Sequence, residues 1–201
     1  MPKTKEQFEQ IKKERMEKIL SASLYLFATK GYNAVTTDEI TNYVGCSHGL
    51  LYHYFGSKED LFSALLETKV KRIIREIADG IDFNASPKFV LIDLVNATLS
   101  SLKSSNDEYA CAIYLLLNLH LQRKDIPKPK NKEKKGSLFD FLYELIEKGK
   151  REGKFYNYNT KEMVISLYAI FKGLSYSRIY IGSQRFTCPN SEIITKMIIK
   201  E

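Results

Sequence analysis

Hydrophobic side chains recur every three or four positions along almost the whole chain. This spacing places them on one side of an α-helix, and no stretch has the strict alternation of a half-buried strand. In the first such stretch, residues 4–30, the inward positions are Met16, Ile19, Leu20, Ser23, Leu26 and Phe27. The pattern predicts an all-α protein whose first helix ends before Gly31, since glycine readily terminates a helix.

Capping residues divide the next stretch into three further helices. Thr36, with Glu39 three residues later, matches a capping box at the start of the second helix. Ser47 and Ser57 stand in the same capping position before the third and the fourth helix, and Gly45 separates the second from the third. We expect the fourth helix to continue to about residue 79.

Longer helices are predicted in the remainder of the chain. Their expected ranges are 86 to about 105, 107 to about 123, from 137 onward, 160 to about 181 and 191–201. A basic, proline-containing stretch at residues 125–136 is predicted to be a loop, and we assign it no function.

The third predicted helix carries more rings than one buried side can accommodate. On a helical wheel with about 100° per residue, Leu51 and Phe55 point towards the core. The remaining arc holds Gly49, Leu50, Tyr52 and His53, while Tyr54 lies nearer the buried side. A short connector whose tyrosines only cover the core is the alternative. It is favoured for Tyr54 and Thr36 taken singly, but not for Tyr52, His53, Gly49 and Lys58 together.

Two helices joined by a turn, the second with such an exposed face, are typical of helix-turn-helix DNA-binding proteins. Gly49 would let the backbone approach the duplex, Leu50 would cover a thymine methyl group, and His48 would reach a base edge. Lys58 and the helix starts would contact phosphates. The candidate DNA-binding residues are Thr36, Thr37, Ser47, His48, Gly49, Leu50, Tyr52, His53, Tyr54 and Lys58.

Residues 15–61 resemble the TetR/AcrR family of bacterial transcriptional regulators. The resemblance is carried by Ile19-Leu20, Leu26-Phe27, Gly31-Tyr32, Thr36-Thr37, Ile40, Gly45, Ser47-His48-Gly49, Leu51 to Phe55 and Ser57-Lys58-Glu59. Thr41 departs from the alanine that is common there, and Leu50 is unusual for the base-reading surface. The resemblance implies a homodimer with an N-terminal three-helix DNA-binding domain and a larger C-terminal helical domain that dimerises and binds a small molecule. We place these domains at residues 1–56 and 57–201, bridged by the helix from Ser57.

The segment from residue 160 to 181 is apolar on nearly every side, which predicts burial between two partners. Together with the final helix it would form a four-helix dimer seam, as the resemblance also implies. The alternative is a central core helix of a monomer. The candidate dimer residues are Met163, Leu167, Ile170, Leu174, Ile194, Met197 and Ile198.

Polar groups among apolar neighbours are what a small-molecule cavity uses to orient its ligand. The candidate ligand-binding residues are Tyr109, Tyr114, Asn118, His120, Tyr143, Tyr168, Phe171 and Tyr176. We expect the effector to be apolar or aromatic. The alternative is an ordinary aromatic core without a ligand.

The composition excludes several classes of protein but does not identify a specific function. The chain has 31 basic and 24 acidic side chains, a net charge of +7, which admits a polyanion as partner without requiring one. The three cysteines have no metal-like spacing and suit a reducing compartment, and no signal or membrane-spanning segment is present. Catalytic and phosphate-binding motifs are absent too. We therefore expect a cytoplasmic protein that is no enzyme and needs no metal or cofactor.

The combined prediction is a ligand-responsive transcriptional regulator that binds double-stranded DNA as a dimer. Repression at a palindromic operator, with release by a small molecule, is the expected mode. A ligand-independent or activating helix-turn-helix protein is the alternative.

Overall fold

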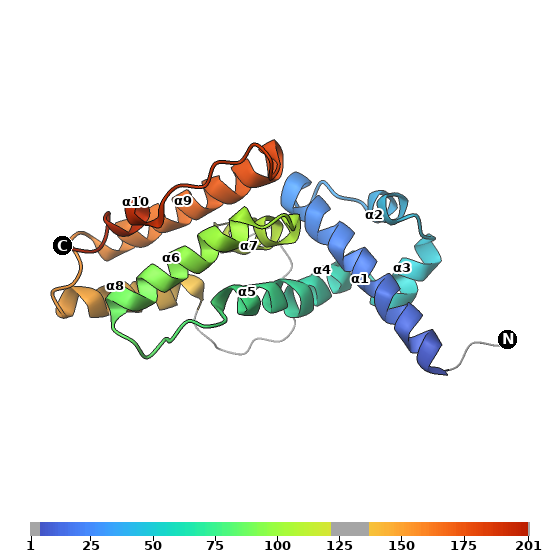
Figure 1. Ribbon diagram of the computed structural model, residues 1–201. Helices are drawn as coiled ribbons and strands as arrows, with labels where there is room; N and C mark the ends of the chain where they lie inside the picture. Colours follow the sequence, from blue (N-terminus) through green and yellow to red (C-terminus); the bar gives the residue numbers. More distant parts are fainter. Residues whose placement is uncertain (1–4, 122–136, 201) are drawn as a thin grey trace. The chain divides into compact units, whose positions relative to one another are not determined.

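The computed structural model describes residues 5–121 and 137–200, with the side chains of residues 120 and 121 left out. Within these residues every regular element is a helix, and strand-like pairing is limited to one bridge between Phe155 and Ile199. The all-α prediction is confirmed. The described residues form two compact units (Figure 1): an N-terminal unit, residues 5–72, and a C-terminal unit, residues 73–121 and 137–200. The predicted domain boundary at residue 56 stays a prediction.

Four helices build the N-terminal unit: α1 (Lys5–Lys30), α2 (Thr37–Val44), α3 (His48–Phe55) and α4 (Lys58–Ala64). Their core is aromatic, because the Phe27, Tyr32 and Phe62 rings lie with centroids 4.8 to 5.5 Å apart. Gly45 takes the left-handed conformation (φ 73°) that the turn between α2 and α3 requires. This turn sets the direction in which α3 leaves α2.

The predicted N-caps of these short helices are confirmed. The hydroxyl groups of Thr36, Ser47 and Ser57 each accept a backbone N–H of the following turn. The capping box at Thr36 is only half formed, however. The Glu39 carboxylate pairs with Lys30 of α1 instead of returning to the cap, because a positive charge on a neighbouring helix offers it a stronger partner than a neutral amide.

The fourth helix continues past Ala64 as a π-helical turn (Leu65–Val70) and then as α5 (Lys71–Ala78). Leu61, Leu65 and Lys69 follow one another at steps of four residues, and all three are buried. In a regular α-helix such steps drift by about 40° each, because four residues turn through about 400°. In a π-helical turn the hydrogen bonds span five residues instead of four, so the turn contains more residues and offsets this drift. Lys69 therefore stays on the inner side, where its ammonium lies 2.7 Å from the Glu17 carboxylate of α1.

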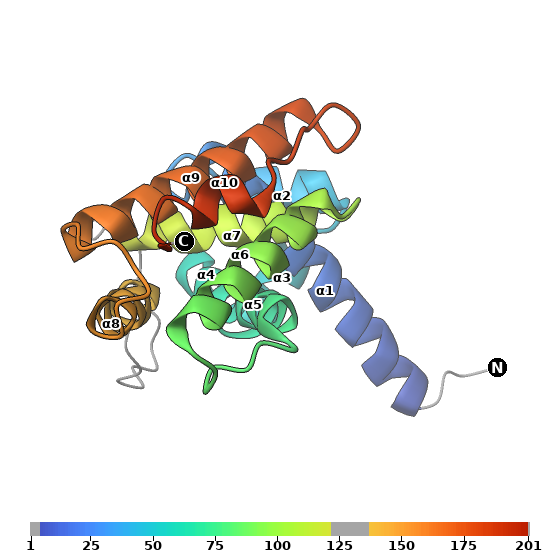
Figure 2. The same ribbon diagram turned by 60° about the vertical axis from the view of Figure 1, so that its left-hand side comes forward.

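The C-terminal unit contains α6 (Pro87–Lys103), α7 (Asp107–Leu121), α8 (Leu138–Arg151), α9 (Thr160–Ile181) and the short α10 (Ser191–Thr195). Helix α9 packs against α7 and α8, and α6 packs against α8 and α10. Figures 1 and 2 both show α10 running beside α9. The predicted extension of the helix from residue 107 to about residue 123, and the predicted loop, fall outside the described residues.

One buried arginine ties three helices of this unit together. Arg178 of α9 is 1% exposed, and its guanidinium donates to the main-chain oxygens of Leu102 and Ser104 at the end of α6. It also pairs with the Asp107 carboxylate at the start of α7, at 2.8 Å. A buried arginine needs such partners, because an unpaired charge in the interior is strongly destabilising.

The predicted final helix, residues 191–201, is wrong in length. Helix α10 ends at Thr195, and the chain then returns to residues 154–156, where Tyr156 N–H donates to Ile198 and Lys200 N–H to Lys154. Phe155, 1% exposed, lies against Gly149 so closely that a Cβ added there would come within 2.3 Å of the ring. The long-range pairing with residues 154–156 therefore forms in place of a continued helix.

Candidate nucleic-acid interface

Helix α3 has one buried side and one bare side, as its sequence predicts. Leu51 is 0% and Phe55 7% exposed, whereas Tyr52 is 45% exposed. Gly49 and His53 are exposed as well, and Leu50 and Tyr54 are half-buried. Leu51 and Phe55 therefore anchor the helix, and the remaining residues stay available to a partner.

Two side chains on the exposed side of α3, Tyr52 and His48, contact α2. The Tyr52 hydroxyl lies 3.4 Å from the Thr37 hydroxyl. At the start of α3, Nε2 of His48 lies 3.3 Å from the Thr41 hydroxyl and 3.4 Å from the Asp38 carboxylate. Thr37, Tyr52 and His48 were all predicted site residues, and the fold brings them to neighbouring positions at the α2–α3 corner.

The Lys58 side chain is held by residues that the sequence analysis did not single out for a role. Its ammonium lies 4.3 Å from the centre of the Tyr32 ring, and Tyr32 donates to the Glu59 carboxylate at 3.0 Å. Burial, together with that hydrogen bond, raises the pKa of Tyr32 to about 12, so its hydroxyl keeps its proton. Burial lowers the pKa of Lys58, and nearby Glu59 acts in the opposite sense. A cation over an aromatic face is held in place without losing its charge.

Three helix starts bring further anion-binding groups to the N-terminal unit. Thr36 precedes α2, Ser47 precedes α3 and Ser57 precedes α4, and Lys58 is the first residue of α4. Backbone amides at a helix start carry partial positive charge and bind phosphate oxygens. These positions match the phosphate contacts expected beside a base-reading helix.

Gly49 is not required by the fold. Its helix needs no left-handed residue there, and a Cβ added to Gly49 would meet no atom within 4 Å. Glycine inside a helix costs about 0.5–1 kcal/mol relative to alanine. Because the fold does not need a glycine at this position, we expect a binding partner to come close to the backbone of Gly49.

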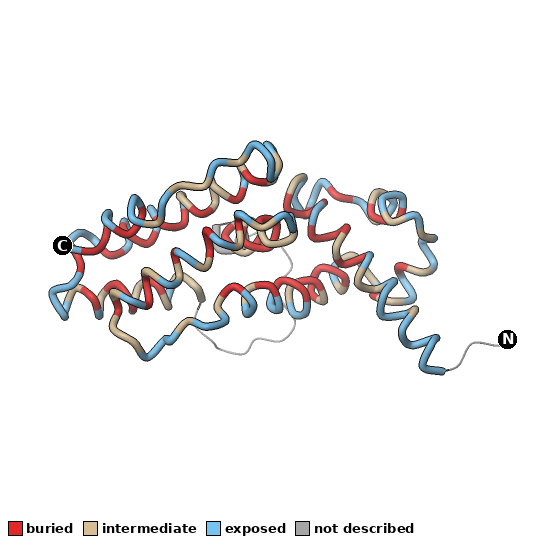
Figure 3. The backbone as a smooth tube through the Cα atoms, viewed as in Figure 1, coloured by how far each residue is buried: buried red, intermediate tan, exposed pale blue. Residues whose placement is uncertain are grey.

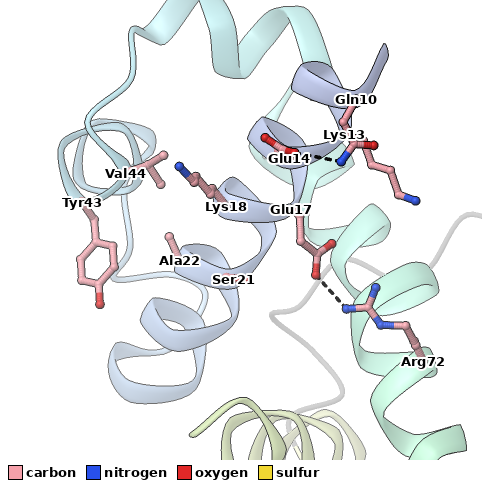
Figure 4. A pocket seen from close by; sticks show the side chains of 10 residues that line it. All are labelled: Gln10, Lys13, Glu14, Glu17, Lys18, Ser21, Ala22, Tyr43, Val44 and Arg72. Atoms are coloured by element: carbon pink, nitrogen blue, oxygen red, sulfur yellow. Dashed lines mark hydrogen bonds and ion pairs between the residues drawn. The ribbon is translucent and has the colours of Figure 1, made fainter. Parts of the chain in front are cut away.

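A separate open groove of about 720 Å³ lies on α1 (Figure 4). Besides α1 residues, Tyr43 and Val44 of α2 and Arg72 line it, and Glu17 accepts a hydrogen bond from Arg72 at its edge. The lining mixes cationic and anionic side chains, and no predicted site residue belongs to it. It is distinct from the α3 face, and we assign it no ligand.

The predicted ligand-binding residues do not gather at one place. Tyr143 and Tyr168 both contact the Phe139 ring, at centroid distances of 6.5 and 6.1 Å, and Phe171 follows Tyr168 on the same helix. Tyr109 instead donates to Glu76, and Tyr114 and Tyr176 pair with each other nearer the surface. Asn118 is half-buried, and the His120 side chain lies outside the described residues. A single ligand would contact only part of this set.

The predicted dimer residues divide by burial. Met163, Leu167, Ile194 and Ile198 are at most 6% exposed, so they are covered within a single chain, and all four line one small pocket. Met197 is 49% exposed, and Ile170 and Leu174 are half-buried. Further exposed apolar residues lie on α9 that were not among the predicted dimer residues, namely Ile165, Tyr176, Tyr180 and Ile181, which are 45–58% exposed, and Ile193 of α10 is 64% exposed. Figure 3 shows this alternation of buried and exposed positions along α9.

The described residues contain neither a membrane-spanning helix nor a cluster of metal ligands. None of their helices has the length and apolarity needed to span a bilayer. Nor do these residues contain a group of three or more histidine, cysteine, aspartate or glutamate side chains placed to hold a metal ion.

The comparisons with known proteins agree with the α3 geometry. The family model described as "Bacterial regulatory proteins, tetR family" matches residues 19–65, which include α2, α3 and α4. The repressor AcnR of Corynebacterium jeikeium is 32% identical over 66 residues, and the match covers 33% of this chain but only 35% of that protein. The repressor KstR2 of Mycobacterium tuberculosis is 27% identical over 136 residues, 67% of this chain and 68% of that protein.

A solved structure extends the likeness over the whole fold. A transcriptional regulator from Saccharomonospora viridis, in complex with choline, superposes with a TM-score of 0.61 at 18% identity, over 94% of this chain and 100% of that one. The fold is therefore shared along nearly the full length, while the family model matches within the N-terminal unit. The family match over residues 19–65, the named relatives and this fold support a TetR-family transcriptional regulator.

Proposed function

We propose that the protein is a transcriptional repressor that binds a palindromic DNA operator as a homodimer and is released by a small molecule. The observation that carries the proposal is the bare side of α3, where Gly49, Tyr52 and His53 are exposed while Leu51 and Phe55 hold the helix from behind. The adjoining helix starts and the Lys58 ammonium supply the positive groups that a phosphate backbone needs.

Dimerisation is supported by the exposed apolar residues of α9 and of the segment around α10. Ile165, Tyr176 and Tyr180 lie on α9, and Ile193 and Met197 extend this apolar surface. Gly173, exposed on α9, would allow a second helix to approach closely, because its added Cβ meets nothing within this chain. Several exposed large apolar side chains in one unit favour an interaction site there.

A dimer would present two α3 helices to one side of the duplex. They read successive major grooves only at a separation of about 34–36 Å. A ligand that favours another separation therefore weakens DNA binding, and ordinary coupling amounts to about 1–3 kcal/mol. The aromatic residues around Phe139, Tyr143 and Tyr168 support an apolar or aromatic effector. The regulator from S. viridis was solved in complex with choline, which supports a small organic molecule as effector.

The test is selection of binding sites from random duplexes by the purified protein, followed by affinity measurements in a series of salt concentrations. Lys58→Ala should weaken binding to all sequences alike and make the salt slope shallower by about one. His48→Gln should instead change the preferred bases and leave the slope unchanged. The same sequence-blind loss in both variants would contradict the roles assigned to α3.

The second candidate is a regulator without an effector, or an activator. It is favoured by the scatter of the predicted ligand residues, since Tyr109 and Tyr114 have partners in different parts of the C-terminal unit. Screening small molecules for release of the selected duplex discriminates the two. A set of apolar and aromatic compounds that changes neither affinity nor thermal stability would favour this candidate.

A further inference from the structure

We propose that Thr41 determines which bases the protein selects, by holding His48 as a hydrogen-bond acceptor towards the DNA. The inference rests on the proposed function, in which α3 enters the major groove. Thr41 lies on α2 and is 1% exposed, so it cannot touch a base itself. It acts as a positioning residue through His48, the first residue of α3.

The hydrogen-bond direction at Thr41 follows from its first partner. The Thr41 hydroxyl oxygen lies 3.0 Å from the main-chain oxygen of Asp38. A carbonyl oxygen can only accept, so the single proton of the hydroxyl is used there. The lone pairs of the same hydroxyl oxygen remain for Nε2 of His48, 3.3 Å away. Nε2 must therefore donate, and it carries a proton.

A second neighbour favours the same arrangement. The Asp38 carboxylate oxygen lies 3.4 Å from Nε2, and an ionised carboxylate can only accept. In a neutral imidazole with its proton on Nε2, the other nitrogen, Nδ1, carries a lone pair. The His48 side chain is 49% exposed, and no residue in the described parts of the chain forms a hydrogen bond with Nδ1. In the neutral ring, the exposed Nδ1 is thus an acceptor.

An acceptor at the start of α3 recognises donors on base edges. In the major groove these are the amino groups of cytosine and adenine, whereas guanine and thymine present only acceptors. We therefore expect cytosine or adenine at the one position in each half-site that faces His48. One neutral hydrogen bond of this kind gives a preference of about three- to tenfold.

The departure of Thr41 from the small alanine common at this position now has a role. With alanine at position 41, Nε2 of His48 would keep only one partner, the carboxylate of Asp38. The side chain of Asp38 is 73% exposed. The buried hydroxyl, in contrast, is fixed by its own bond to the α2 backbone. It therefore holds the ring more firmly than the exposed carboxylate does.

The first arm of the test uses the free protein and needs no DNA. Long-range ¹H–¹⁵N NMR at a pH above the histidine titration reports which ring nitrogen carries the proton, and His48→Gln identifies the signals. We expect a proton on Nε2 in the wild type and in Thr41→Ser, and a mixture of both tautomers in Thr41→Val. A wild-type His48 with its proton on Nδ1 would overturn the proposal.

The second arm compares base selection by the same proteins. Thr41→Val keeps the branched shape but lacks the hydroxyl, so it should lose the three- to tenfold preference at one position and keep the salt slope. Thr41→Ser should retain the preference. An unchanged preference in folded Thr41→Val would refute the positioning role. If the wild type selects no duplex at all, the proposed function fails and base selection with it, while the NMR result still decides the tautomer.

Discussion

At the level of single residues, the protein keeps groups on α3 that its own stability does not need. Gly49 fills no tight space, and the Tyr52 ring stays nearly half exposed. The periodicity of the sequence was sufficient to predict this, because one turn separates Leu51 from Phe55 and only one side of a short helix can be buried. The partners of His48 and Lys58 were not predictable, since Tyr32, Asp38 and Thr41 reach them through the fold.

Gly49→Ala should make the free protein more stable and the complex weaker. Alanine is the better helix former by about 0.5–1 kcal/mol, and its methyl group meets nothing within 4 Å in this chain. On DNA the same methyl group would hold the backbone away, with an expected loss in affinity of about tenfold. Urea unfolding and titration of the selected duplex measure the two effects.

The matched control for this variant is Asn96→Ala, at an exposed position of α6. It should raise stability slightly and leave DNA affinity unchanged. If Gly49→Ala binds DNA as tightly as the wild type, the backbone at Gly49 does not approach the duplex.

At the level of helices, local signals predicted the starts well and the ends less well. Caps at Thr36, Ser47 and Ser57 act through the next turn, so a single sequence contains them. The π-helical turn and the early end of α10 depend on contacts with distant residues, Glu17 for the first and Lys154 to Tyr156 for the second. Such contacts cannot be predicted from a local sequence pattern.

The contact between α1 and the π-helical turn should be a main contributor to the stability of the N-terminal unit. The Lys69 ammonium is 2% exposed, and both Lys69 and Arg72 donate to the Glu17 carboxylate at 2.7 Å. Glu17→Gln removes the negative charge beside a buried cation, and we expect a loss of about 1–3 kcal/mol in the free energy of unfolding at neutral pH. Glu14→Gln, an exposed change on the same helix, should stay within about 0.5 kcal/mol.

The effect of Glu17→Gln should also depend on pH. Burial alone would raise the pKa of Glu17, but the hydrogen bonds and charges of Lys69 and Arg72 outweigh it and lower the pKa. The carboxylate therefore stabilises the folded state above the ordinary glutamate pKa, and this contribution is lost as the pH falls through the lowered, folded-state value. Denaturation curves of wild type and variant should converge in acid; a constant difference at all pH values would contradict this account.

For the whole molecule, the sequence predicted an apolar α9 but not which of its residues a single chain would cover. Met163 and Leu167 are buried within the chain, whereas Ile165 and Tyr180 remain exposed. A helix that is apolar all round carries no sequence signal that separates core from interface. The packing of α6, α7 and α8 against α9 makes that separation.

Ile165→Glu should convert the proposed dimer to a monomer. Ile165 is 58% exposed, so the charge costs the folded chain little but would be buried unpaired in a dimer. Light scattering coupled to size-exclusion chromatography measures the change. Binding to a two-half-site operator should fall by about a hundredfold or more, because the two reading helices are no longer linked. Asn96→Glu, which adds the same charge on α6, should leave both properties unchanged.

The wide turn at Leu65–Val70 has a consequence for comparing this chain with its relatives. A π-helical turn accommodates one residue more than an ordinary turn, so a homologue with a regular helix needs one residue fewer to bring the same side chain to Glu17. An alignment of such a pair should open a single-residue gap inside the helix, where gaps are normally penalised. Without that gap, Lys69 would be equated with a residue that faces water.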